Sequence, residues 1–212
     1  MSGLLIESHF LPSLEYFCLL SRYEDIRLEA HEYYVKQSYR NRCYLLSAHG
    51  AERHTIPLTG KHGKVPIHEV RIDYSVRWQA NFWRSVQSAY ANSPFFEHYR
   101  DDLHDALFAS KPYLLGLNLD MLSLCLKWLG WKKSVSLSAS YEVKTDRDDF
   151  RNLISDKRDF RNRTILRANP YPQVFGNPFV PNLSILDLVC CVGPDAGRYI
   201  SGSAAAGANE NY

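Results

Sequence analysis

The sequence lacks most of the motifs that assign a function at once. It contains no glycine-rich dinucleotide fingerprint, no P-loop, no GxSxG nucleophile elbow and no HExxH zinc motif. Its five cysteines form no CxxC pair, and the vicinal Cys190 and Cys191 follow an apolar run that is typical of a core. We therefore expect reduced thiols in a cytoplasmic protein, and we predict no metal site and no cofactor.

The chain also lacks a strong charge imbalance and a long apolar run. Its 25 basic and 23 acidic residues give a net charge of +2, which does not draw in nucleic acid over the whole surface, so we expect no nucleic-acid partner. The longest apolar stretch, residues 113–129, is interrupted by Asn118, Asp120 and Lys127, and we expect no membrane span. The N-terminus has neither the basic region nor the cleavage site of a signal peptide.

Hydrophobic residues are plentiful enough for a core. They make up 45% of the 212 residues, and aromatic residues make up 13%. A chain of this length buries roughly 70% of its unfolded surface, so one domain forms without disulfides. We predict a single domain over residues 1–200 and a disordered tail over residues 201–212, because the tail is small and polar.

The order of the hydrophobic patterns predicts the α+β class. Short apolar or alternating runs suggest strands, and apolar residues at helical spacing dominate the middle of the chain. We expect a mixed sheet, made by an N-terminal strand–helix–strand unit and a hairpin, to pack against the helical middle segment. The expected strands are residues 3–8, 25–29, 42–47, 53–59, 65–73 and 134–142, with the hairpin turn at 48–51 and helices between 78 and 129.

The densest polar cluster directly follows the second expected strand, where connections at a sheet edge often carry sites. Lys36 and Arg42 offer donors for phosphate or carboxylate, and Tyr39 suits stacking on a base or sugar ring. The imidazole of His31 is a side chain that often acts as a general base, and Glu32 is the alternative base. The competing interpretation is a solvated, salt-bridged connector.

A second polar cluster contains Asp149, Arg151 and Lys157. Its simpler interpretation is a capped, charged helix end. The string DFRN occurs here, at residues 149–152, and again at residues 159–162. Two copies are too few for a repeat architecture, and we attribute the echo to chance and local helix chemistry.

A third cluster contains Gln173, Asn182, Ser184 and Asp187. Asn182 and Ser184 directly precede the apolar run that begins at Ile185, and their side chains suit the cap of a helix there. Helix capping alone is therefore an alternative to ligand binding for these two residues.

These clusters, taken in order, resemble the WbqC-like protein family. The strings that carry the resemblance are residues 10–17 (FLPSLEYF), 36–43 (KQSYRNRC), 78–96, 149–157 and 171–188. They occur in family order, and the resemblance extends over about nine-tenths of the chain, omitting the tail. Members of the family are associated with bacterial O-antigen and other surface-polysaccharide gene clusters, and a role in attaching an amino acid such as glycine to an amino sugar has been suggested. The resemblance implies a substrate site made of Lys36, Tyr39, Asn41, Arg42, Asp149, Arg151, Lys157, Gln173, Asn182, Ser184 and Asp187.

The chain departs from the family pattern at two places. Ser8-His9 stands where a Gln-Pro pair is usual, and Cys191-Val192 stands where an Asn-Glu pair commonly precedes Gly-Pro. The resemblance favours the hypothesis of acyl or aminoacyl transfer to the amine of a nucleotide- or carrier-linked sugar, a small anionic substrate. In this hypothesis Glu32 or His31, the candidate bases of the first polar cluster, takes the amine proton. The loss of the acidic group favours an alternative, a non-catalytic protein that binds a nucleotide or sugar phosphate. A third interpretation, a phosphate-cradling loop at His9 as in adenylyl-transferring enzymes, lacks the second histidine of that motif.

Overall fold

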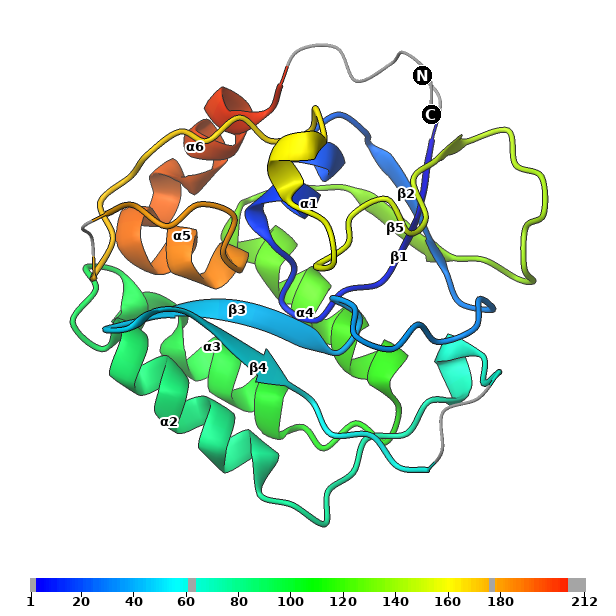
Figure 1. Cartoon of the computed structure of the whole chain (residues 1–212), viewed down its shortest axis with the longest axis horizontal. Helices are drawn as coiled ribbons and strands as arrows, with labels where there is room; N and C mark the ends of the chain where they lie inside the picture. The colour runs from blue at the N-terminus through cyan, green and yellow to red at the C-terminus, as the bar shows by residue number, and fades with distance from the viewer. Residues whose placement is uncertain (1–2, 61–63, 176–177, 206–212) are drawn as a thin grey trace.

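The computed structural model describes residues 3–60, 64–175 and 178–205 (Figure 1). Strands and helices alternate at the start of the chain, and helices dominate the middle and the end. The strands are β1 (Leu4–Glu7), β2 (Asp25–Glu29), β3 (Arg42–Ser47), β4 (Gly50–Thr55), β5 (Ser134–Leu137) and β6 (Asp148–Asp149). The α-helices are α1 (Leu14–Leu20), α2 (Trp78–Tyr90), α3 (Phe96–Phe108), α4 (Leu114–Trp128), α5 (Ile185–Val192) and α6 (Ala196–Ser203), and the 3-10 helices are η1 (Ile67–Glu69), η2 (Phe160–Asn162) and η3 (Gly193–Asp195).

The central sheet is parallel, with the strand order β5-β2-β1-β6. Strand β1 is buried along its whole length, which explains its continuous apolar run in place of an alternating pattern. Counted along the chain, these four strands have the order 3-2-1-4, so the order reverses between β1 and β6. In open α/β sheets the carboxyl ends of the strands at such a reversal are the usual place for a ligand.

The hairpin of β3 and β4 forms a second, antiparallel sheet of two strands. The chain therefore has both parallel and antiparallel strand pairs together with a helical middle segment, and the predicted α+β class is confirmed. Figure 1 shows the hairpin at the centre of the view, between α2 on one side and α5 on the other. Alternate side chains of the hairpin therefore point toward different layers.

Several expected strand limits were wrong. Strand β4 begins at Gly50, inside the expected turn, and ends at Thr55, because the last hairpin pair is Ser47 with Gly50. Gly50 has a φ of 102°, a conformation that glycine adopts without strain. Strand β5 ends at Leu137 and not at residue 142.

Residues 65–73 do not form the expected strand. The 3-10 helix η1 follows Pro66, whose fixed φ and missing N–H suit the position before a helical turn. The N–H of Ile67 then donates to the carbonyl of Glu32 at 2.8 Å, so this backbone pairs with a loop. Isolated bridges, including Leu58 with Ile72, replace a continuous ladder.

The end of the chain differs from the expected tail in its first residues. Helix α6 extends through Ser203, so the predicted tail begins with helical residues. Residues 206–212 of that prediction lie outside the described part of the chain. No helix of the described residues is long and apolar enough to cross a membrane.

Candidate functional site

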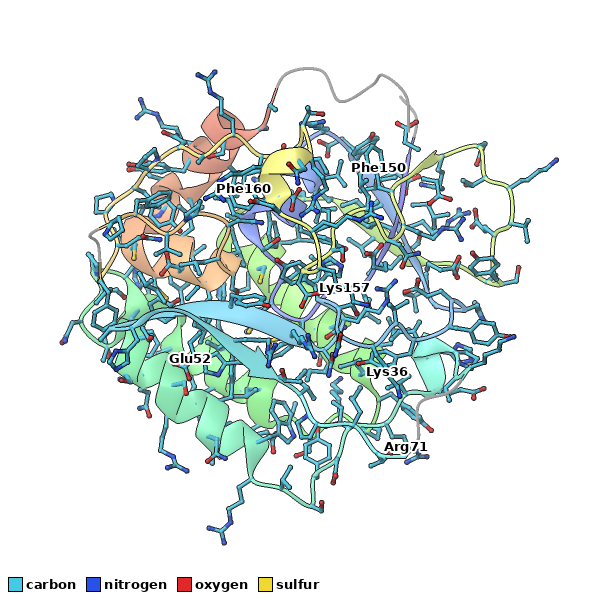
Figure 2. All side chains as sticks on the ribbon, in the orientation of Figure 1. Lys36, Glu52, Arg71, Phe150, Lys157 and Phe160 are labelled. Carbon is cyan, nitrogen blue, oxygen red and sulfur yellow. The ribbon has the colours of Figure 1, made fainter. Side chains whose placement is uncertain are left out.

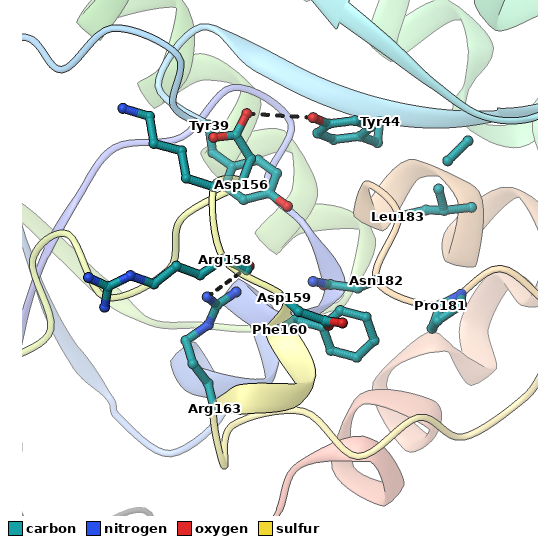
Figure 3. A pocket seen from close by; sticks show the side chains of 12 residues that line it. Tyr39, Tyr44, Asp156, Arg158, Asp159, Phe160, Arg163, Pro181, Asn182 and Leu183 are labelled. Carbon is teal, nitrogen blue, oxygen red and sulfur yellow. Dashed lines mark hydrogen bonds between the residues drawn. The ribbon is translucent and has the colours of Figure 1, made fainter.

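The best candidate site is a cavity of about 320 Å³ between the hairpin, the segment after β6 and the loop before α5, which we call the Tyr39 cavity (Figure 3). A volume of this size accommodates a small ligand. The cavity is lined by Tyr39, Tyr44, Ala51, Asp156, Lys157, Arg158, Asp159, Phe160, Arg163, Pro181, Asn182 and Leu183. Segments more than a hundred residues apart in the sequence therefore share one hollow.

A buried ion pair fixes the part of this cavity that lies against α1. Arg163 donates from Nε and Nη2 to the two carboxylate oxygens of Glu15, at 2.7 and 2.8 Å. Asn182 joins the pair, because its Oδ1 accepts the backbone N–H of Glu15 at 2.9 Å and its Nδ2 donates to Glu15 Oε2 at 3.4 Å. Helix α1, the segment after η2 and the loop before α5 are therefore held together by bidentate and charge-assisted hydrogen bonds, the strongest class of hydrogen bond in proteins.

Aromatic side chains form the wall beneath the hairpin. The rings of Tyr39 and Tyr44 meet edge to face with centroids 6.0 Å apart. The Tyr39 hydroxyl points into the cavity in Figure 3. Burial, followed by the charges and hydroxyl nearby, raises the pKa of Tyr39 well above its usual value, so this hydroxyl keeps its proton and is a hydrogen-bond donor for a ligand.

The mouth of the cavity has more positive than negative charge. Lys157 and Arg158 are exposed, and neither forms an ion pair with another described residue. The carboxylate of Asp156 is held by Arg42 at 3.3 Å, and Asp159 by Arg161 at 3.0 Å. Two unpaired cations beside neutralised carboxylates are suited to hold phosphate or carboxylate groups.

A buried polar network lies next to this cavity, where β1 and β6 meet. His9 and Glu7 are fully buried, and His9 Nε2 contacts Glu7 Oε1 at 3.1 Å. The backbone N–H of Asn152 donates to Glu7 Oε2 at 2.9 Å, and Arg40 donates to Asn152 Oδ1 at 2.8 Å. The segment that contains Arg40 and the segment that contains Asn152 therefore meet at the switch point of the parallel sheet.

Burial and charge pairing act in opposite directions on the pKa values of this network. Burial lowers the pKa of His9 more than Glu7 raises it, so His9 is neutral at pH 7. Burial alone would raise the pKa of Glu7, but the hydrogen bond with His9 and the charge of Arg40 outweigh it and leave the pKa lowered. Burial raises the pKa of Glu32 despite its bidentate bonds from Arg40, both 2.7 Å.

The structure brings three of the sequence-predicted site residues together in the Tyr39 cavity, one from each polar cluster: Tyr39, Lys157 and Asn182. Arg42 lies next to them through its ion pair with Asp156. The remaining predicted residues lie elsewhere.

Two predicted residues lie at the edge of the parallel sheet beside Glu29. Arg151 donates to Asp149, and also to Glu29 Oε2 at 2.9 Å. The hydrogen bond with Asp149 is the main reason that the pKa of Arg151 is raised. Each charge already has an internal partner, but Asp149 lies in strand β6 and Arg151 in the turn after it, not at the helix end that the simpler interpretation of this cluster predicts.

The two candidate bases do not line the Tyr39 cavity. Glu32 is bound by Arg40, and the His31 ring packs against the His68 ring with centroids 4.7 Å apart. Lys36 is exposed on the connecting loop (Figure 2).

Asn41 stabilises the conformation of that loop. Its side chain is buried, accepting from the Tyr34 hydroxyl at 2.9 Å and donating to the Ile56 carbonyl at 2.8 Å. Its amide therefore ties the connecting loop to the chain that leaves the hairpin.

The rest of the third cluster supports α5. Ser184 accepts the N–H of Leu186 at 3.3 Å, so it caps the helix as the capping interpretation predicts. Asp187 is buried and accepts from Tyr171 at 2.7 Å and from Gln173 at 2.9 Å. Burial raises the pKa of Asp187 in spite of these bonds.

Sequence reasoning missed several cavity residues, above all Asp156, Arg158 and Arg163, and also Glu15, which holds Arg163 in place. The ion-pair partners of Glu15, Asp156 and Arg163 lie more than a hundred residues away in the sequence, so no local pattern joins them. One signal was present: the second DFRN copy, at 159–162, supplies Asp159 and Phe160 to the cavity.

Metal ligation has no support in the described residues, which contain no group of three or more His, Cys, Asp or Glu side chains placed to hold an ion. The cysteines are also unsuited to bind a metal. All five are buried thiols, and burial raises the pKa of Cys191 to about 12.

The comparison with protein families gives one match. The model of the WbqC-like protein family matches residues 7–167 and residues 154–199. No curated protein and no solved structure matches the chain. The matched segments contain both the polar network at the end of β1 and the lining of the Tyr39 cavity. The chain belongs to the WbqC-like protein family.

Proposed function

We propose that the Tyr39 cavity binds a nucleotide- or carrier-linked amino sugar and that the protein transfers an acyl or aminoacyl group to its amine. The observation that carries the proposal is the meeting of Tyr39, Lys157 and Asn182 in one cavity. Lys157 and Arg158 hold the phosphate, and the rings of Tyr44 and Phe160 contact the sugar. Membership of a family loosely associated with polysaccharide genes supports the sugar as substrate.

The transfer requires a neutral amine and a stabilised oxyanion. The amine nitrogen attacks the carbonyl carbon of an activated acyl donor, the new C–N bond forms, and the bond from that carbon to the donor's leaving group breaks. Asp156, whose Oδ1 has no hydrogen-bond partner among the described residues, accepts the amine proton. The Tyr39 hydroxyl donates to the oxyanion. This assignment places the base in the cavity, in contrast to His31 and Glu32.

The test is product formation. Wild-type protein is incubated with amino-sugar nucleotides and acyl or aminoacyl donors, and products are identified by their mass. Asp156→Asn should lose turnover while retaining ligand-induced thermal stabilisation, and Lys157→Ala combined with Arg158→Ala should lose that stabilisation. Lys36→Ala, an exposed cation outside the cavity, is the matched control and should change neither.

One observation favours a second function, binding without turnover. The two bases expected from the sequence lie outside the cavity, and Glu32 is occupied by Arg40. A binding protein would be stabilised by a nucleotide sugar or sugar phosphate but would not consume it. Stabilisation of the wild type with no product across the donor panel would support this function and refute the transfer.

A further inference from the structure

A second cavity, of about 300 Å³, lies between the hairpin and α2, and we call it the Trp78 cavity. It is lined by Phe10, Glu52, His54, Thr55, Ile56, Trp78, Asn81, Phe82 and Ser85, and it shares no lining residue with the Tyr39 cavity. In the hairpin register Tyr44 pairs with Arg53 and Cys43 pairs with His54, so Tyr44 and His54 lie on opposite faces. Glu52 lies between the hairpin and α2 in Figure 2.

The charges of the Trp78 cavity differ from those of the Tyr39 cavity. Glu52 is the one side chain among its described lining residues that carries a charge at pH 7. Burial lowers the pKa of His54 more than the charge of Glu52 raises it, and the imidazole is neutral. The described lining residues include no lysine or arginine to hold phosphate or carboxylate, and Glu52 repels both.

Two ring nitrogens of the lining residues lack hydrogen-bond partners among the described residues. They are His54 Nε2 and Trp78 Nε1, which come from the hairpin and from α2, and both are buried. Buried polar atoms in native proteins nearly always have a partner, so these two need one. The indole nitrogen only donates, whereas a neutral imidazole nitrogen donates or accepts according to its tautomer.

A hydroxyl group suits both nitrogens, because it donates and accepts. The rest of the lining has the same mixed character, with hydroxyls on Thr55 and Ser85, an amide on Asn81 and a carboxylate on Glu52. The rings of Phe10 and Phe82, whose centroids are 5.4 Å apart, form an apolar wall beside these groups. An apolar wall with a few convergent polar groups is the usual construction of a small-molecule site.

We infer that the Trp78 cavity is a second binding site, for an uncharged polyhydroxy ligand of about the size of one sugar ring. The site goes beyond the proposed transfer, because it lies on the other face of the hairpin and the one charged side chain of its described lining, Glu52, disfavours anions.

The test follows the indole N–H signals of the four tryptophans by NMR. The signal of Trp78 is identified by its disappearance in Trp78→Phe. Methyl α-glucoside and inositol, added to about 10 mM, should shift this signal in a saturable way. Inorganic phosphate and tetramethylammonium, added to the same concentration, should leave it in place.

Asn81→Ala tests the site without touching the core, since Asn81 is exposed on α2. Loss of its amide should weaken polyol binding about five- to tenfold. Gln87→Ala, an exposed residue of the same helix outside the cavity, is the control and should bind as the wild type does. No shift with any polyol, a shift with phosphate or tetramethylammonium, or equal binding by Asn81→Ala and Gln87→Ala would each overturn the inference. None of these results depends on turnover in the Tyr39 cavity.

Discussion

Replacing Arg163 by methionine tests whether a buried ion pair maintains the Tyr39 cavity. Glu15 is 0% exposed and Arg163 is 6% exposed, so the pair is shielded from water. Arg163→Met removes the bonds of 2.7 and 2.8 Å and leaves the Glu15 side chain one amide contact, of 3.4 Å from Asn182. Leaving one buried charge without its partner costs about 3–5 kcal/mol, which for a chain of this length lowers Tm by about 6–20 °C.

Urea unfolding at pH 7, followed by circular dichroism, measures this cost. Arg161→Met is the matched control, because Arg161 is 67% exposed in its pair with Asp159 and should cost at most about 1 kcal/mol. In the double variant Glu15→Gln/Arg163→Met no uncompensated charge remains, and part of the lost stability should return. If Arg163→Met and Arg161→Met cost the same, the ion pair has no structural role in the cavity and our reasoning is refuted.

Two further predictions concern buried titratable groups. His54 has a lowered pKa in the folded state, so the unfolded chain binds more protons below pH 6.5 and the stability contributed by neutral His54 is lost as the pH falls. The unfolding free energy of wild type relative to His54→Gln should therefore decrease from pH 7.5 to pH 5, by at most about 1.4 kcal/mol per pH unit, and a constant difference would contradict the assignment. The five cysteines are buried, and burial raises the pKa of Cys18 and Cys191 to about 12, so native protein should react slowly with a thiol reagent at pH 8 and completely in denaturant. A cysteine that reacts fast in the native protein would contradict the prediction, because it would show that its thiol is accessible to solvent.

Local patterns predicted the helices better than the strands. The apolar spacing from Trp78 to Ala89 predicts α2, and its apolar positions are buried. Strand β6 has two residues, Asp148 and Asp149, both acidic, and no propensity predicts such a strand. It exists because the N–H of Asp148 donates to the carbonyl of Gly3, a long-range pairing that the local sequence does not encode.

The sequence predicted the polar clusters that contribute to the candidate site, but not which of their residues line the cavity. Polarity marked both Lys36 and Tyr39, yet only Tyr39 lies at the cavity. The difference arises from the backbone N–H of Phe10, which donates to the Tyr39 carbonyl at 2.9 Å and binds that part of the loop to the chain after β1. Lys36 lies in the same loop, three residues earlier, and stays in solvent.

The topology explains why the site lies beside a network of paired charges. At the carboxyl ends of β1 and β6 the parallel sheet would offer a ligand crevice, but Arg40 and Asn152 already occupy it with Glu7 and His9. These internal partners occupy most of the polar groups that a ligand would otherwise meet there, and His9 Nδ1 alone among the ring and carboxylate atoms of His9 and Glu7 has no hydrogen-bond partner among the described residues. The neighbouring Tyr39 cavity has two cations, Lys157 and Arg158, that form no ion pair with another described residue, and this difference supports our proposal that the ligand binds there and not at the sheet edge.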